Sequence, residues 1–207
     1  MSDIPRWLQW AREIQALAQT GITFAHSEYD LERNRRLVEI AAEIVEHHSD
    51  FAKEPLIADM LAQPGYATPK IDVRSAVIRD GKILLVKERM DGCWCMPGGW
   101  ADVGDAPAEA AAREVLEESG FIVKPVKIVA VCDANRSGRP LQLYHAFKII
   151  FLCELIGGAA AESFETEGVD FFDFDDLPPL SENRTNRRHL DMVRAHVNNP
   201  QMPAFFD

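Results

Sequence analysis

The sequence has few cysteines, a deficit of basic residues and no long apolar run. Its four cysteines form no Cys-x-x-Cys pair, and Cys93 and Cys95 would point to opposite sides of a strand. A zinc site is therefore not expected, and we predict free thiols in a reducing cytoplasm. With 22 Lys and Arg against 33 Asp and Glu, the formal net charge is -11. Nucleic acid is not expected as a main partner, because phosphate-backbone binding needs a basic surface.

No apolar run approaches the roughly 20 residues that would span a bilayer. The most apolar stretch, 149–156, is interrupted by Glu154 and reads as a buried strand. The first residues do not have the pattern of a signal peptide. We therefore expect a cytoplasmic protein without a membrane partner. A length of 207 residues with 47% hydrophobic residues fits one ordinary domain and a small second one.

Apolar periodicity divides the chain into a helical part and a mixed part. Helices are predicted over 5–20, 28–48 and 54–62, before Pro64-Gly65 breaks the pattern, which gives a helical domain over 1–65. The remaining 66–207 is predicted to be an α+β domain, an α/β/α sandwich. Its predicted strands are 71–79, 82–89, 126–133, 144–155 and a short one from Phe171, and its last helix is 182–197. Asp80-Gly81 predicts a hairpin between the first two strands.

Glu114, Glu117 and Glu118 have the spacing i, i+3 and i+4, which places them together on one helix face. Three adjacent carboxylates repel one another, and a divalent cation would reverse that cost. Mg²⁺ and Mn²⁺ prefer oxygen ligands, and such ions commonly bridge carboxylates to substrate phosphates. Pro107 suits the first turn of this helix, and Gly120 suits the left-handed position after it. The sequence therefore predicts a metal site on this helix.

The two glycines before the helix, Gly98 and Gly99, allow the backbone to approach a ligand closely. A carbonyl of Gly98 is a candidate additional metal ligand.

The segment from Gly99 to Phe121 resembles the signature of Nudix hydrolases, Gly-x5-Glu-x7-Arg-Glu-U-x-Glu-Glu-x-Gly-U, where U is bulky and aliphatic. Matching residues are Gly99, Arg113, Glu114, Glu117, Glu118 and Gly120, with Val115 and Leu116 near the first aliphatic position. The resemblance implies metal binding by the three glutamates and a catalytic set that includes Arg113. Asp105 stands in place of the first signature Glu, which pairs with the signature Arg in the family. Because Asp105 is one methylene shorter, we expect it to help cap the helix instead.

The rest of the chain is similar to a Nudix subgroup with a helical N-terminal domain. The similarity rests on Trp7-Leu8-Gln9-Trp10-Ala11, on residues 65–70 and on the loop 98–104. This subgroup is similar to the CDP-choline pyrophosphatases, although such sequences are often labelled ADP-ribose pyrophosphatases. The resemblance implies hydrolysis of a nucleoside diphosphate linked to a small group, first CDP-choline to CMP and phosphocholine. The alternatives are ADP-ribose hydrolysis and a non-catalytic nucleotide sensor; the acidic balance disfavours a nucleic-acid-directed hydrolase.

Substrate contacts are less well specified. Arg74, Lys87 and Arg89 are candidate phosphate ligands, although each is more often a surface charge at such a position. Four aromatic residues are candidates for stacking on a base or enclosing a choline-like cation: Trp94, Trp100, Tyr144 and Phe164. Of these four, we predict Trp100 as a substrate-binding residue. A second candidate base lies in the acidic loop 161–167. We also expect a homodimer, because the few N-terminal helices carry wide apolar stripes.

Overall fold

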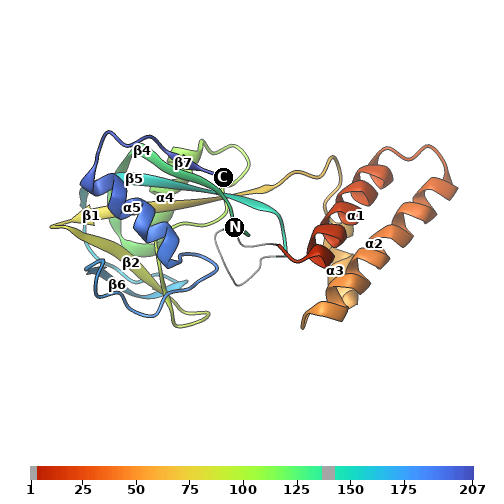
Figure 1. Ribbon diagram of the computed structural model, residues 1–207, viewed down its shortest axis with the longest axis horizontal. Coiled ribbons are helices and arrows are strands. Elements are labelled where there is room, and N and C mark those ends of the chain that lie inside the picture. The colour runs from red at the N-terminus through yellow and green to blue at the C-terminus, as the bar shows by residue number, and fades with distance from the viewer. Residues whose placement is uncertain (1–3, 137–142) are drawn as a thin grey trace. The chain divides into compact units, whose positions relative to one another are not determined.

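The computed structural model describes residues 4–136 and 143–207, and this part of the chain separates into two compact units (Figure 1). The first comprises the N-terminal residues up to Pro69 together with 143–145. The second comprises the remainder, from Lys70 onward. None of the helices in the described ranges is both long and apolar enough to cross a membrane.

The first unit contains three helices, α1 (Arg6–Thr23), α2 (Glu28–His48) and α3 (Lys53–Leu61). Helix α2 begins after Ser27, whose hydroxyl accepts a hydrogen bond from the backbone N–H of Asp30. Helices α1 and α2 pack closely at Gly21, where an added Cβ would lie 2.2 Å from Oδ1 of Asn34. The small core of this unit is formed mainly by Ala11, Ala18, Val38, Ala42, Val45, Leu56 and Met60.

The apolar stripe that the sequence shows along α1 consists of Trp7, Trp10, Ala11, Ile14, Leu17 and Ala18. Ala11 and Ala18 are buried in the core of this unit, and Leu8 is buried as well. Trp10 and Leu17 are 51% and 65% exposed, as expected of a stripe that a single small unit cannot cover completely. Periodicity located the stripe, but it could not separate its packed members from its exposed ones.

The second unit is built on a mixed β-sheet with the strand order β3-β2-β1-β5-β4-β7 in the described residues, and β6 pairs with β2. Strands β1 and β5 are parallel, whereas β1–β2 and β4–β5 are antiparallel. The strands are β1 (Lys70–Arg79), β2 (Lys82–Glu88), β3 (Trp94–Cys95), β4 (Phe121–Asp133), β5 (Ala146–Gly158), β6 (Thr166–Phe172) and β7 (Phe205–Phe206). The predicted α+β class is confirmed.

The hairpin predicted at Asp80-Gly81 joins β1 to β2, with Ile78 opposite Ile83. Both turn residues have positive φ, 53° at Asp80 and 77° at Gly81. A two-residue turn of this kind matches the twist of the flanking strands, which is why Asp-Gly is favoured there.

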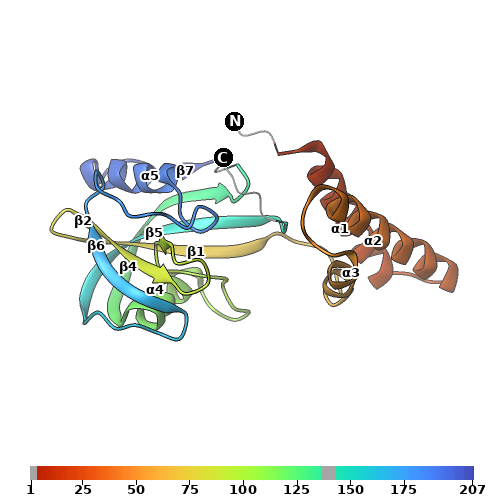
Figure 2. The same cartoon turned by 90° about the horizontal axis from the view of Figure 1, so that it is seen from below.

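Two helices cover opposite faces of this sheet, α4 (Pro107–Ser119) and α5 (Arg187–Asn198) (Figure 2). Helix α4 packs Ala111 and Val115 onto one face with Val73, whereas Leu190 of α5 packs onto the other with Ala76. The alternation along β1 therefore supplies both cores, as expected for a strand buried on both faces. This is the predicted three-layer sandwich.

Several predicted boundaries were wrong. Strand β4 begins at Phe121, directly after α4, not near Val126, and α1 continues to Thr23, beyond the predicted end at residue 20. Strand β6 begins at Thr166, not near Phe171, because the end of the acidic loop pairs with β2. Helix α5 begins after Asn186, not near Glu182. The Asn186 side chain accepts from the backbone N–H of His189, whose ring accepts from the N–H of Asn186. Residues 181–185 form a turn instead, with backbone bonds to the carbonyl of Ser181.

Candidate active site

Helix α4 carries the three glutamates, and its ends follow the expected local rules. Pro107 occupies the first turn, and Gly120 after the last turn is left-handed with φ 74°. The N–H of Gly120 bonds to the carbonyl of Leu116, which satisfies one of the free carbonyls at the helix end. The helix therefore begins and ends where the sequence predicted.

Glu118 is the most enclosed carboxylate of the helix, with 5% of the residue exposed. Its Oε2 accepts a hydrogen bond of 2.9 Å from the backbone N–H of Gly98. Burial raises the pKa of Glu118 to about 8, and the nearby acids Glu88 and Glu114 also raise it. Arg74 and the Gly98 N–H act in the opposite direction. The buried surroundings of Glu118 therefore disfavour the ionised form of its carboxylate.

Glu114 and Glu117 both contact Arg113. The guanidinium Nη1 lies 3.0 Å from Oε1 of Glu114 and 2.9 Å from Oε2 of Glu117. The Glu114 side chain is 13% exposed and that of Glu117 is 56% exposed. Burial raises the pKa of Glu114. The helix thus presents two enclosed carboxylates, Glu114 and Glu118, and one at the surface.

The expected role of Asp105 as a helix cap was wrong. Its Oδ2 lies 3.2 Å from Nη2 of Arg113, so the shorter side chain does reach the arginine. The residue at the N-cap position is Ala106, and no side chain caps the helix there. The pair forms although Asp105 has a short side chain, because the loop before α4 brings its carboxylate close to Arg113.

Gly98 and Gly99 hold the loop against β1 and α4. At Gly98, φ is 143° and an added Cβ would lie 2.0 Å from the carbonyl oxygen of Val73, so only glycine fits. The carbonyl of Gly99 accepts from the N–H of Val73 at 2.8 Å. A Cβ on Gly99 would lie 3.2 Å from Oε2 of Glu114. The loop therefore places backbone atoms directly beside both enclosed carboxylates.

The donor chemistry of this place fits a hard divalent cation. Glu114 and Glu118 supply carboxylate oxygens next to the Gly98–Gly99 backbone, and a bound cation would offset the burial that raises the pKa of Glu118. The side chains are not yet gathered as a ligand set: the described residues contain no group of three acidic, His or Cys side chains placed to hold a metal. Glu117, which is turned towards Arg113, would have to change partner to join them.

The four predicted substrate residues lie in different environments. Arg74 is 5% exposed, so the interpretation of it as an ordinary surface charge was wrong. Lys87 and Arg89 are at the surface, where they pair with acidic residues of the 162–167 segment at 2.7 Å and 3.5 Å. Trp100 is 49% exposed and its backbone bridges β1.

The burial of Arg74 is explained by its partners. Its Nε lies 2.8 Å from Oδ1 of Asp72, and Nη1 donates to the carbonyl of Met96 at 3.3 Å. Asp72 also pairs with Lys148, 3.1 Å away. Of the predicted phosphate ligands, Arg74 is the one whose charge acts on Glu118.

The other candidate aromatic residues lie in different environments. Trp94 packs edge-on against Phe172, with ring centroids 4.7 Å apart, whereas Phe164 is 95% exposed. Tyr144 belongs to the first unit. All four cysteines are free thiols, as predicted.

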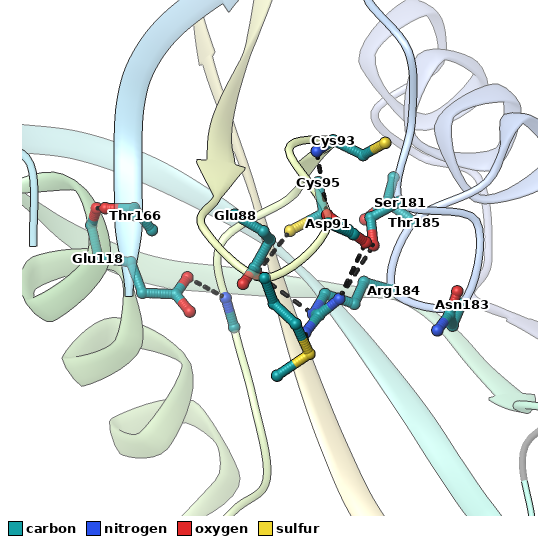
Figure 3. A network of polar contacts seen from close by, with 12 residues as sticks. Glu88, Asp91, Cys93, Cys95, Glu118, Thr166, Ser181, Asn183, Arg184 and Thr185 are labelled. Carbon is teal, nitrogen blue, oxygen red and sulfur yellow. Dashed lines mark hydrogen bonds and ion pairs between the residues drawn. The ribbon is translucent and has the colours of Figure 1, made fainter. Parts of the chain in front are cut away.

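Sequence reasoning missed an acidic and a basic residue beside this site, Glu88 and Arg184 (Figure 3). Oε1 of Glu88 accepts from the thiol of Cys95 at 3.2 Å and lies 3.3 Å from Nε of Arg184. The signal for Glu88 was its place at the end of β2, two and four residues after buried Val86 and Leu84. Arg184 lies in a turn without a regular pattern, and no local signal marked it.

Comparisons with known proteins identify the family of the chain. The model of the NUDIX domain matches residues 69–193, and the model described as "UDP-X-like, N-terminal oligomerisation domain" matches residues 5–59. The Bacillus subtilis protein named "Putative ADP-ribose pyrophosphatase YjhB" is 38% identical over 202 residues, which cover 98% of this chain and 97% of that protein.

Two solved structures are also similar. A structure titled as a UDP-X diphosphatase is 32% identical with a TM-score of 0.64, covering 97% of this chain and 98% of that one. An ADP-ribose pyrophosphatase from Streptococcus suis is 35% identical with a TM-score of 0.63, covering 68% of this chain and 100% of that one. The chain belongs to the Nudix hydrolase family. It is thus a pyrophosphatase of the class that acts on nucleoside diphosphates linked to another moiety, and such enzymes generally use divalent metal ions.

Proposed function

We propose that the chain is a Mg²⁺- or Mn²⁺-dependent pyrophosphatase whose first candidate substrate is CDP-choline, cleaved to CMP and phosphocholine. The observation that supports it is the pair of enclosed carboxylates, Glu114 and Glu118, beside the Gly98–Gly99 backbone. A negatively charged diphosphate could not approach two carboxylates without a cation between them.

The residues divide into those that would hold the metal and those that would set their positions. Glu114, Glu117 and Glu118 would hold the ion, with the Gly98 carbonyl as an additional ligand. When bound, the ion would lower the pKa of water and shield the charge of the phosphates. Arg113 lies within 3.0 Å of Glu114 and Glu117 and would set the positions of these side chains. In the reaction, the oxygen of a water molecule bonds to one phosphorus and the bridging P–O bond breaks, which gives two phosphate monoesters. A carboxylate, either one of the α4 glutamates or one in the loop 161–167, would accept the proton that the attacking water releases.

The choice of substrate rests on different grounds. CDP-choline follows from the subgroup motifs at 7–11, 65–70 and 98–104. ADP-ribose is the second candidate, favoured by the names of the Bacillus and Streptococcus relatives. Trp100 and Phe164 remain exposed and free to contact a choline group or a base, whereas Trp94 is engaged with Phe172.

Initial rates of hydrolysis test both the metal dependence and the choice of substrate in this proposal. CDP-choline, ADP-ribose, NADH and nucleoside triphosphates would each be assayed with Mg²⁺, with Mn²⁺ and with excess chelator. We expect turnover with metal only, and a higher kcat/KM for CDP-choline. A tenfold preference for ADP-ribose would identify the second candidate, and nucleotide binding without any turnover would indicate the sensor. Full activity in chelator would overturn the metal mechanism.

We also propose that the chain is a homodimer formed through its first unit. The match to an N-terminal oligomerisation domain over residues 5–59 is consistent with an oligomer. Trp10 and Leu17 on α1, together with Phe24 and Tyr29 after it, are all more than half exposed in the single chain. Large apolar side chains gathered on one small unit are typical of an association surface.

A further inference from the structure

The turn 181–185, which precedes α5, is fixed against the strand that leads into the glycine loop. The N–H of Ser181 donates to the carbonyl of Trp94 at 2.8 Å. The hydroxyl of Thr185 accepts from the N–H of Met96 at 2.9 Å. Because Met96 is followed directly by the Pro-Gly-Gly loop, these two bonds place the turn at the edge of the carboxylate site.

A buried lysine of β5, in the same sheet, also fixes this turn. The ammonium of Lys148 donates to the carbonyls of Asn183 and Arg184. It also pairs with Asp72 at 3.1 Å, which compensates part of the cost of burying the charge. The main chain of Arg184 is therefore held in one position before any ligand is present.

The guanidinium of Arg184 is oriented on one side and open on the other. Its Nε lies 3.3 Å from Oε1 of Glu88, and Nη1 lies 3.3 Å from Asp91 and 3.1 Å from the Ser181 hydroxyl. The contact of Nη2 is with the thioether of Met90 at 3.9 Å, and thioethers are weak acceptors. Within the described residues, the two N–H groups of Nη2 on this partly exposed guanidinium thus have no strong acceptor.

Glu88 connects this arginine to the carboxylates of α4. The register of β2 with β6 shifts between Lys87 and Glu88. Glu88 is 5% exposed and lies between Glu118 and Arg184 (Figure 3).

We propose that Arg184 binds a phosphate oxygen of the diphosphate substrate, with Glu88 and Asp91 orienting its guanidinium; this inference rests on the proposed function. Guanidinium groups suit phosphate because they offer several fixed N–H donors. Arg74 is closed in by Asp72 and Met96, whereas 22% of the Arg184 side chain is exposed. A metal ion on α4 and Arg184 would then hold the diphosphate from two sides.

The test compares Arg184→Gln and Arg184→Lys with Arg194→Gln. Arg194 is a matched control, because it forms a bidentate surface pair with Asp175, at 2.6 and 2.8 Å, away from the site. Two quantities are measured. One is the KM and kcat for CDP-choline and ADP-ribose with Mn²⁺. The other is the affinity for methylenediphosphonate, a diphosphate with an uncleavable bridge, determined by calorimetric titration with Mg²⁺.

For Arg184→Gln we expect a KM at least tenfold higher, a kcat within threefold of wild type and a tenfold loss of methylenediphosphonate affinity. The KM and the methylenediphosphonate affinity of Arg184→Lys should lie between those of wild type and Arg184→Gln. For Arg194→Gln, both quantities should stay within twofold of wild type. A purely structural arginine would lower the melting temperature but leave KM and affinity unchanged, which would overturn the assignment. Should Arg184→Gln fail to fold, wild-type affinity in Arg184→Lys overturns it.

The two proposals fail in different ways. Wild-type protein that hydrolyses no nucleoside diphosphate derivative would refute the proposed function alone, because methylenediphosphonate binding still reports on Arg184. Wild-type protein that does not bind methylenediphosphonate would overturn the assignment of Arg184, whatever the rates of hydrolysis.

Discussion

Replacing Glu118 by glutamine should have opposite effects on activity and on the stability of the metal-free protein. Glutamine keeps an oxygen that can accept from the N–H of Gly98, 2.9 Å away, and it removes the charge. Without that charge the metal loses its most enclosed ligand, so kcat should fall by roughly 100-fold or more. At the same time, the substitution removes a carboxylate that burial makes difficult to ionise.

The size of the stability effect follows from the pKa. Burial raises the pKa of Glu118 from an ordinary value of 4.5 to about 8. Because the folded pKa is the higher one, its stabilising contribution is complete below the ordinary pKa and is lost as pH rises through about 8. At pH 7 the loss amounts to about 3 kcal/mol, at roughly 1.4 kcal/mol per pH unit. The Glu118→Gln protein avoids it, so its melting temperature should be about 5 to 10 °C higher.

Thermal melts in chelator between pH 5 and pH 8 measure this difference directly. We expect the gap between Glu118→Gln and wild type to widen as pH rises and to be small at pH 5. Glu117→Gln is the matched control, because the Glu117 side chain is 56% exposed on the same helix and should show no such trend. Adding Mn²⁺ should raise the melting temperature of wild type and leave Glu118→Gln nearly unchanged. A metal-free Glu118→Gln protein that melts no higher than wild type at pH 8 would refute the reasoning.

Two further predictions concern the loop and the first unit. Gly98→Ala should destabilise the fold by on the order of 3 kcal/mol, seen as a lower urea midpoint, because its Cβ would lie 2.0 Å from the Val73 carbonyl oxygen; an unchanged midpoint would contradict this. The double variant Trp10→Glu with Leu17→Glu should be a monomer of 23.2 kDa by light scattering, against twice that mass for wild type. A wild-type monomer at micromolar concentration would rule out the dimer.

The parts of the structure that the sequence predicted are those decided by neighbouring residues. Helix α4 begins at Pro107 and ends before Gly120 because each residue satisfies a local backbone requirement. The hairpin at Asp80-Gly81 likewise depends on two residues that accept positive φ. The acidic face of α4 follows from helix spacing alone. These features need no contact from a distant part of the chain.

The features that the sequence did not reveal depend on contacts between distant segments. Arg74 looked like a surface charge, and its burial depends on Asp72 and on Lys148 from another strand. On α1, Ala11 and Ala18 pack into a core with residues of α2 and α3, whereas Trp10 stays exposed. In each case the sequence gives the residue type but does not identify the distant residues that it contacts.

The same distinction separates the two halves of the candidate site. The carboxylates that would hold a metal lie within one helix, at spacings that periodicity fixes, so the metal chemistry could be predicted from sequence. Arg184, which we propose to bind the diphosphate, and Glu88, which would orient it, come from distant segments: Glu88 from β2, and Arg184 from a turn that Lys148 of β5 anchors. Glu88 could have been suspected, because an acidic side chain continues the alternation of Leu84 and Val86. The proposed contact with the diphosphate therefore depends on side chains that only the three-dimensional fold brings together.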